Sequence, residues 1–198
     1  MTPDSSRYQT ALTQIDAANA LDPNRATFGG QEFPAELIYS RRMTAWLEKI
    51  EPAASEALRL AVRCQHLRRW DIPRATFPMT RAGYHQWRTK LAFYHAERAG
   101  EILQSAGYDH ALIARVQSLI RKESLKTDAE AQTLEDVACL VFLENDYVDF
   151  ARKHEPEKVI DIVRKTWRKM SPCGQALALD LAKGLPETEL GLVVKGIS

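Results

Sequence analysis

The chain has 198 residues, of which 45% are hydrophobic, enough to bury a sizeable core. Its formal net charge of +1 excludes a global field that would drive it onto nucleic acid or an anionic membrane. No segment approaches the ~20 consecutive apolar residues that a membrane-spanning helix needs. The first ten residues also lack the basic end and apolar run of a signal peptide, so we expect a soluble, cytoplasmic protein.

The first half of the chain shows apolar residues at helical spacing between proline, glycine and aspartate breakers. We predict a helix capped by residues 4–6 and stopped by residues 22–23, a second between Pro34 and Pro52, a third from about Ser55 to Trp70, and a long one from Tyr84 to about Ser105. The glycine pair in RATFGGQEFP (residues 25–34) predicts a flexible loop instead.

The second half continues the helical pattern with clear capping residues. Asp109 and Asp128 each open a helix, and Ser171-Pro172 opens another that runs to Lys183. A further helix is predicted over Glu155–Lys169, followed after Lys183 by a short apolar tail. No segment alternates as a strand would. The chain is therefore predicted to be all-α, a single bundle of about seven to eight helices over residues 1–198.

The stretch RCQHLRRWDIPR (residues 63–74) places polar residues at the end of an apolar helix. On a helical wheel, Gln65, Arg68 and Arg69 fall within or beside the apolar arc, while His66 and Trp70 lie on the narrow remaining face. Buried donors need partners. We therefore expect carboxylates to meet this helix end.

The candidate carboxylates lie in TLEDVACLVFLE (residues 133–144), where Glu135 and Asp136 share stripes with apolar residues. A buried carboxylate is unexpected unless it is paired or binds a ligand. We predict that one of the two pairs with His66, Arg68 or Arg69. Two interpretations remain open: a structural ion pair that joins two helices, or a site in which His66 works as an acid or base beside the carboxylates.

The following loop is basic and aromatic. Arginine forks bind phosphate or carboxylate in a bidentate manner, and indole faces stack on bases or guanidinium groups. The pattern predicts that the protein binds a small molecule bearing a phosphate or carboxylate group, and a nucleotide is one candidate. The near-neutral net charge argues against nucleic acid as the ligand. The predicted ligand-binding residues are Arg68, Arg69, Trp70, Arg74, Trp87 and Arg88. The alternative is that these arginines are a solvated face or internal clamps.

The order of segments over residues 34–150 resembles the HD superfamily of helical metal-dependent phosphohydrolases. IYSRRMTAWL is similar to the early segment of that family, with Tyr39 in place of its first histidine. LAVRCQHLRR is similar to the helix that ends in a His-Asp pair, with Gln65 and His66 at those positions. Asp136 matches the final aspartate. The resemblance implies a helical core, residues 34–150, flanked by residues 1–33 and 155–198, and a phosphohydrolase activity.

Tyr39 and Gln65 replace the histidines of the HD pattern, and an amide is a poor ligand for divalent metals. We therefore expect no cofactor and no stoichiometric, tightly held divalent ion. The alternative is a rearranged metal site. Its candidate ligands are His66, His85, His95, Glu135 and Asp136.

The whole chain resembles an uncharacterised family of bacteria and fungi, the domain of unknown function 4202. The resemblance lies in QHLRRWDIPR, in GY-x-x-WR at residues 83–88 and in LEDVACLVFLE. It implies no established function. Our functional hypothesis is therefore a helical protein that binds an anionic small molecule and hydrolyses it, with His66, Glu135 and Asp136 as catalytic candidates. The alternative is a non-catalytic interaction or scaffold domain whose buried ion pairs only order the bundle.

Overall fold

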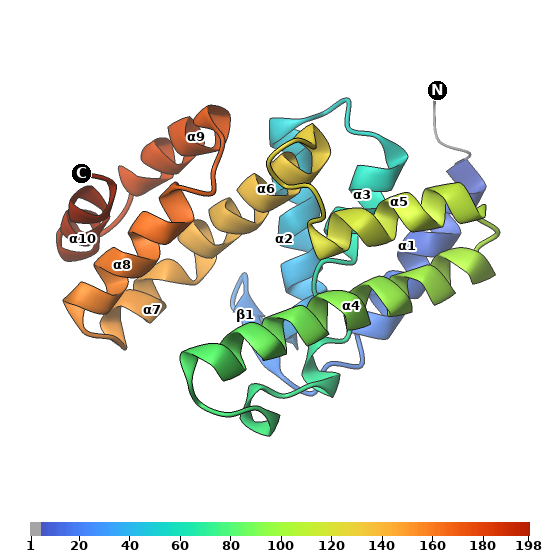
Figure 1. Cartoon of the computed structure of the whole chain (residues 1–198), viewed down its shortest axis with the longest axis horizontal. Helices are drawn as coiled ribbons and strands as arrows, with labels where there is room; N and C mark the ends of the chain where they lie inside the picture. The colour runs from blue at the N-terminus through green and yellow to red at the C-terminus, as the bar shows by residue number, and fades with distance from the viewer. Residues whose placement is uncertain (1–4) are drawn as a thin grey trace. The chain divides into compact units, whose positions relative to one another are not determined.

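The computed structural model describes residues 5–198 and confirms the all-α class (Figure 1). Within these residues it contains ten α-helices, more than the seven to eight predicted, together with two 3₁₀ turns and one two-stranded hairpin. The chain divides into two compact units, Met1–Ser124 and Leu125–Ser198. The predicted HD-like core, residues 34–150, extends across the boundary between them.

The first unit contains the hairpin and the first five helices. Its elements are α1 (Ser5–Asn19), β1 (Arg25–Phe28), β2 (Gln31–Pro34), α2 (Ala35–Ile50), α3 (Glu56–Arg63), η1 (Arg69–Asp71), η2 (Arg74–Thr76), α4 (Arg81–Ser105) and α5 (His110–Arg121). Asp4, which was predicted to cap α1, lies outside the described residues.

The second unit contains the remaining five helices. They are α6 (Ala129–Asn145), α7 (Tyr147–Arg152), α8 (Pro156–Trp167), α9 (Pro172–Ala182) and α10 (Glu187–Ile197). The helix count exceeds the prediction because the chain turns at Asp146, which separates α7 from α6, and because the apolar tail forms α10.

The segment predicted as a flexible loop is a β-hairpin. Strands β1 and β2 pair antiparallel, and Phe28 faces Gln31 across a two-residue turn. Gly29 and Gly30 both have positive φ, 58° and 79°, which is the backbone that tight hairpin turns require and that glycine adopts without strain. The prediction missed the strands because their side chains are mostly exposed and show no apolar alternation.

The core of the first unit forms where α4 packs along α5 and α3 packs against α5 and α2 (Figure 1). Burying each large aliphatic side chain contributes roughly 1.5–3 kcal/mol, so this core dominates the stability of the unit. Its largest fully buried side chains are Ile15, Met43, Leu47, Leu58, Leu60, Leu67, Leu91, Leu103, Leu119 and Ile120.

The start of α2 is held by a buried aspartate from the preceding segment. Asp22, 2% exposed, accepts hydrogen bonds from the backbone N–H of Glu36 at 2.9 Å and from the backbone and side chain of Asn24 at 2.9 and 2.8 Å. A carboxylate at a helix N-terminus satisfies N–H groups that have no partner within the helix and complements the helix dipole. Asp22 thereby fixes the position of Glu36.

The third helix ends earlier than predicted. α3 stops at Arg63, and consecutive turns carry the chain through residues 64–68. Arg68 takes a left-handed conformation (φ 54°, ψ 38°), and its backbone N–H donates to the Asn19 side chain at 3.2 Å. No glycine or proline marks this break in the sequence. The helical wheel drawn through residue 70 therefore does not describe Gln65, Arg68 and Arg69.

The second unit is organised by α6 packed on α9 and by α8 packed on α10. Ser171 caps α9 as predicted, accepting a hydrogen bond from the N–H of Gly174. The cap is tied to α6, because Asp136 accepts hydrogen bonds from the Ser171 backbone at 2.9 Å and from the Ser171 hydroxyl. A separate apolar cluster contains Tyr147, Ala151, Val159, Ala182 and Val193.

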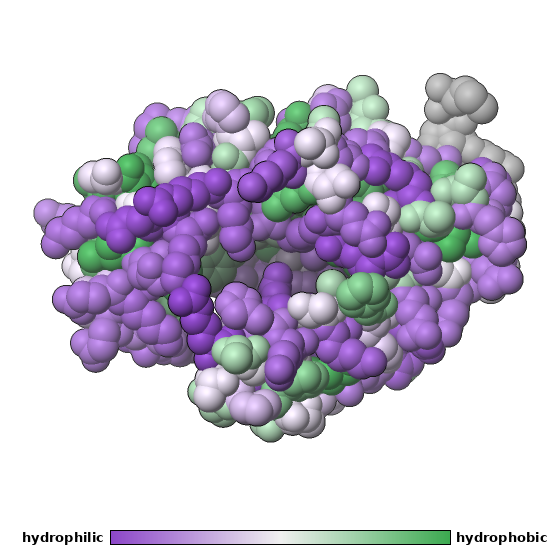
Figure 2. Space-filling view, in the orientation of Figure 1, coloured by the Kyte–Doolittle hydropathy of each residue, from purple (hydrophilic) through white to green (hydrophobic). Residues whose placement is uncertain are grey.

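The surface is largely hydrophilic on the face shown in Figure 2, with scattered apolar side chains. Cys64 and Cys139 are buried, whereas Cys173 is exposed. None of the helices in residues 5–198 combines the length and the apolar character that crossing a bilayer demands.

Replacing Asp22 with alanine should lower the free energy of unfolding by about 2–3 kcal/mol, because Asn24 and the N-terminus of α2 lose their charged acceptor. Urea unfolding followed by circular dichroism measures the change. Glu101→Ala is the matched control, since it removes an exposed carboxylate whose ion pair with Arg98 lies at the surface, and it should cost less than about 1 kcal/mol. Equal effects of the two substitutions would contradict the role given to Asp22.

Candidate functional site

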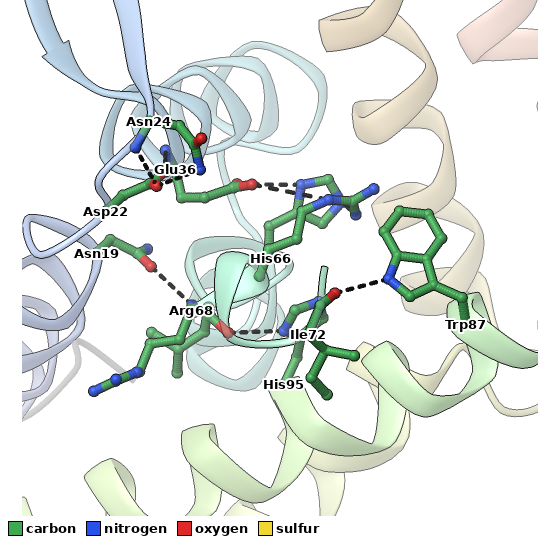
Figure 3. A network of polar contacts seen from close by, with 11 residues as sticks. Asn19, Asp22, Asn24, Glu36, His66, Arg68, Ile72, Trp87 and His95 are labelled. Carbon is green, nitrogen blue, oxygen red and sulfur yellow. Dashed lines mark hydrogen bonds and ion pairs between the residues drawn. The ribbon is translucent and has the colours of Figure 1, made fainter. Parts of the chain in front are cut away.

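The candidate site lies in the first unit, where a chain of polar contacts links α2 to the turn after α3. The Glu36 carboxylate approaches His66 Nδ1 at 3.3 Å, and His66 Nε2 lies 3.1 Å from Arg69 Nη1 (Figure 3). Arg69 Nε is 3.9 Å from the same carboxylate. All three side chains are mostly buried, with exposed fractions of 14%, 18% and 24%. The acid, the imidazole and the guanidinium therefore act on one another with little screening by solvent.

These contacts fix the proton on His66. A guanidinium can only donate, so His66 Nε2 must accept from Arg69, and Nδ1 must carry the hydrogen that faces Glu36. Burial holds the pKa of His66 well below its ordinary value, and the neighbouring Arg69 lowers it further. His66 is thus a neutral ring that faces the Glu36 carboxylate through Nδ1 and holds the Arg69 guanidinium through Nε2.

Arg69 is also held from the other side by an aromatic ring. Its guanidinium carbon lies 4.7 Å from the centre of the Trp87 ring, a distance at which cation and ring attract each other. The Trp87 indole N–H donates to the Ile72 carbonyl at 2.8 Å, which locks the ring against the loop (Figure 3). Burial lowers the pKa of Arg69, as does the nearby Arg88, while Glu36 opposes them.

His95 on α4 is a second neutral histidine close to the first. Its Nδ1 lies 2.7 Å from the Leu67 carbonyl, which can only accept, so Nδ1 carries the hydrogen. The rings of His66 and His95 are 6.0 Å apart. Burial lowers the pKa of His95 to about 4, partly offset by the hydrogen bond to Leu67. His95 therefore presents an unprotonated Nε2 at neutral pH.

A small cavity of about 20 Å³ opens between these groups, large enough for about one water-sized group. Arg88 lies on its wall and is otherwise exposed to solvent, and no hydrogen bond or ion pair holds its side chain within residues 5–198. The lining residues are Gln65, His66, Arg69, Arg88, Leu91, Ala92 and His95.

Within the first unit, the carboxylate that meets His66 and Arg69 is Glu36. The predicted pairing with Glu135 or Asp136 stays a prediction, because these two acids belong to the second unit. Both acids are buried, as their apolar stripes predicted. Asp136 accepts from Ser171 and from Gln132, and Glu135 is 3.6 Å from Lys169. The Asp136 carboxylate is occupied in holding the start of α9.

Only part of the predicted ligand-binding set comes together. Arg69 and Arg88 line the cavity, and Trp87 packs on Arg69. Arg68 points away from His66 (Figure 3) and pairs with Asp71 at 2.7 Å. Trp70 contacts the Arg68 guanidinium at 5.8 Å rather than the cavity.

Arg74 serves the loop in which it lies. It donates to the Phe77 carbonyl at 2.9 Å and to the Pro78 carbonyl at 2.8 Å. These bonds fit the alternative interpretation, in which Arg74 is an internal clamp.

The candidate metal ligands are divided between the two units. In the first unit the rings of His66 and His95 lie near each other, while His85 is exposed and contacts Tyr84; Glu135 and Asp136 belong to the second unit. Within residues 5–198, no group of three or more histidine, cysteine, aspartate or glutamate side chains is placed to hold a metal ion.

The sequence reasoning missed Glu36 and gave His95 only a place among metal ligands. Glu36 stands in the first turn of α2, where an acid is ordinarily explained by the helix dipole, so the sequence carried no signal for a site role. His95 carried a weak signal, because a histidine on the same helix stripe as Leu91 and Arg88 faces the interior.

Fold and site together define a helical protein with a buried carboxylate–histidine–arginine chain beside a small cavity. The model of the family described as Domain of unknown function (DUF4202) matches residues 9–193, so the chain belongs to this family. No curated protein and no solved structure matches the chain.

The two neutral histidines predict that the fold loses stability as the pH falls. Their folded pKa values lie below the unfolded value of about 6.5, so the unfolded chain binds more protons below that pH and is favoured there. Between pH 7 and pH 5 we expect His95 to contribute a loss of about 1–2 kcal/mol, and His66 to add a loss of the same sign, measured by urea unfolding at each pH.

His95→Asn should make that pH dependence less steep, because its amide nitrogen can still donate to Leu67 while the titrating ring is gone. His110→Asn, at an exposed position of α5, is the control. An unchanged pH dependence in His95→Asn would show that the ring is not held neutral.

Proposed function

We propose that the first unit binds a phosphate- or carboxylate-bearing small molecule through Arg69 and Arg88. The observation that carries this proposal is the convergence of two guanidinium groups on one cavity. Glu36 is the carboxylate that faces Arg69, and it stands 3.9 Å away, while no ion pair holds Arg88 within residues 5–198. The positive charges of Arg69 and Arg88 repel each other, and an anion at the mouth of the cavity would relieve that repulsion.

Arg69 is suited to recognition because its side chain is already ordered. His66 and Trp87 fix its orientation and use only part of its donor capacity, which leaves N–H groups for a ligand. A side chain held in place before binding loses little conformational entropy when the anion arrives. Arg88 supplies a second, solvent-facing charge that can draw the anion in.

The finer proposal is that the ligand is a nucleotide and that the protein hydrolyses its phosphate. It is supported by the resemblance to HD phosphohydrolases and by the neutral His95 beside the cavity, because its Nε2 lone pair can accept a proton from water. The proposal is tested by incubating the protein with nucleotides and measuring release of inorganic phosphate. Binding without release would favour a non-catalytic ligand-binding domain.

The scaffold alternative is favoured by a different observation. The Glu36–His66–Arg69 chain links α2 to the turn after α3 and would stabilise the unit without any ligand. Under this alternative, no anion should raise the melting temperature beyond the general effect of salt, whereas a ligand that binds only the folded state does raise it.

Arg88→Gln should weaken the binding of any anion found in a thermal-shift screen of nucleotides and phosphorylated or carboxylated metabolites. Loss of a charge-assisted hydrogen bond is worth roughly 1.5–3 kcal/mol, or about ten- to a hundred-fold in affinity, which titration calorimetry measures. The melting temperature without ligand should change little, because Arg88 is exposed.

Arg69→Gln should weaken binding to a similar extent and also lower the melting temperature, since Arg69 packs on Trp87 and bonds to His66. Arg81→Gln on the exposed first turn of α4 is the control for charge alone. If Arg69→Gln and Arg88→Gln both destabilise the fold but leave affinity intact, these arginines are internal clamps and the proposal is wrong.

A further inference from the structure

Two hydrogen-bond acceptors on the wall of the cavity have no donor among residues 5–198. They are His95 Nε2 and Gln65 Oε1, both buried, in residues that are 3% and 6% exposed. Proteins rarely leave buried acceptors unsatisfied, because each has given up its hydrogen bond to water. The two atoms therefore indicate a donor that belongs to a bound molecule.

The orientation of His95 makes this acceptor a fixed one. Because Nδ1 donates to the Leu67 carbonyl, the lone pair of the neutral ring is on Nε2. A proton on Nε2 would make the ring a buried cation beside Arg69 and Arg88, which burial and like-charge repulsion both disfavour. The cavity therefore combines acceptors on His95 and Gln65 with donors on Arg69 and Arg88.

We infer that this site selects an oxyanion that carries a proton, as hydrogen phosphate does, over one that carries none, such as sulfate or a carboxylate. The inference rests on the proposed binding of an anion by Arg69 and Arg88. The P–OH group would enter the cavity and donate to His95 Nε2, with Gln65 Oε1 as the neighbouring acceptor. The remaining phosphate oxygens would stay at the mouth and accept from the two guanidinium groups.

The size of the cavity fits this arrangement. About 20 Å³ accommodates one hydroxyl-sized group and not a whole phosphate, so only one oxygen enters. An unprotonated oxygen of sulfate would face lone pairs on both acceptors, with no hydrogen between them. A site built around a donor rejects an analogue that lacks it, because the buried polar groups are then left unpaired.

Titration calorimetry with sodium phosphate and sodium sulfate, on the full chain at neutral pH and equal ionic strength, tests the inference. Phosphate carries at least one proton under these conditions and sulfate carries none. We expect phosphate to bind at least about tenfold more tightly than sulfate. Equal affinities would overturn the inference.

Two variants remove the acceptors one at a time. His95→Asn keeps a donor for the Leu67 carbonyl and lacks Nε2, and Gln65→Met has a similar volume without the amide oxygen. Each should weaken phosphate binding by roughly tenfold and leave sulfate binding unchanged. If one variant fails to fold, as judged by circular dichroism, the other carries the test, and undiminished preference for phosphate in the folded variant would contradict the inference.

Arg88→Gln separates this inference from the proposed function. If both anions bind equally and Arg88→Gln weakens both, the arginine site stands and selection by a proton is wrong. If neither phosphate nor sulfate binds to the wild-type chain, the proposed function fails for these anions and the inference fails with it. A phosphate affinity that Arg88→Gln leaves unchanged would place the anion elsewhere and would overturn both.

Discussion

The hydrogen bond between His66 and Arg69 is the contact on which the geometry of the site depends. The Arg69 guanidinium can donate hydrogen bonds but cannot accept them. The contact therefore forces one tautomer on His66, in which the Nδ1 hydrogen faces Glu36. The carboxylate is in turn placed by Asp22 at the N-terminus of α2. Losing any link would leave a buried polar group without its partner, which costs more than the hydrogen bond contributes.

The stretch RCQHLRRWDIPR carries so many polar residues because each serves a different neighbour. Arg63 forms a two-pronged ion pair with Asp16 on α1, at 2.8 and 2.7 Å, and also contacts Thr44. Arg68 holds Asp71, and Arg74 binds loop carbonyls. Only Gln65, His66 and Arg69 reach the cavity. Most of the charged side chains in this segment thus join helices or hold the loop, and only a few of them form the candidate site.

Local signals predicted much of the helical framework. Asp109, Asp128 and Ser171 cap the helices that they were expected to open, because a side-chain acceptor for the first N–H groups is a property of a few adjacent residues. The end of α3 at Arg63 had no such signal. The left-handed Arg68 is stabilised by Asn19, which is far away in the sequence, so the break depends on tertiary contacts.

The types of residue in the site could be predicted from the sequence, but the residue that pairs with His66 could not. An enclosed cluster of His66 and Arg69 requires a carboxylate, and the buried Glu135 and Asp136 were the natural candidates from their apolar stripes. The sequence could not indicate that Asp136 is needed at the start of α9 or that an ordinary first-turn acid, Glu36, faces the histidine. Both outcomes follow from how helices pack.

The central claim is that the contacts between Glu36, His66 and Arg69 hold the Arg69 guanidinium at an anion-binding cavity. Nitrogen-15 NMR of the histidine rings tests this claim most directly. The account predicts that His66 and His95 are both neutral at pH 7, with the hydrogen on Nδ1. It also predicts that saturating phosphate shifts the His95 Nε2 signal as that atom accepts a hydrogen bond, while the His66 tautomer stays the same. A ring found protonated on Nε2, or a His95 signal that phosphate leaves unmoved, would contradict the account.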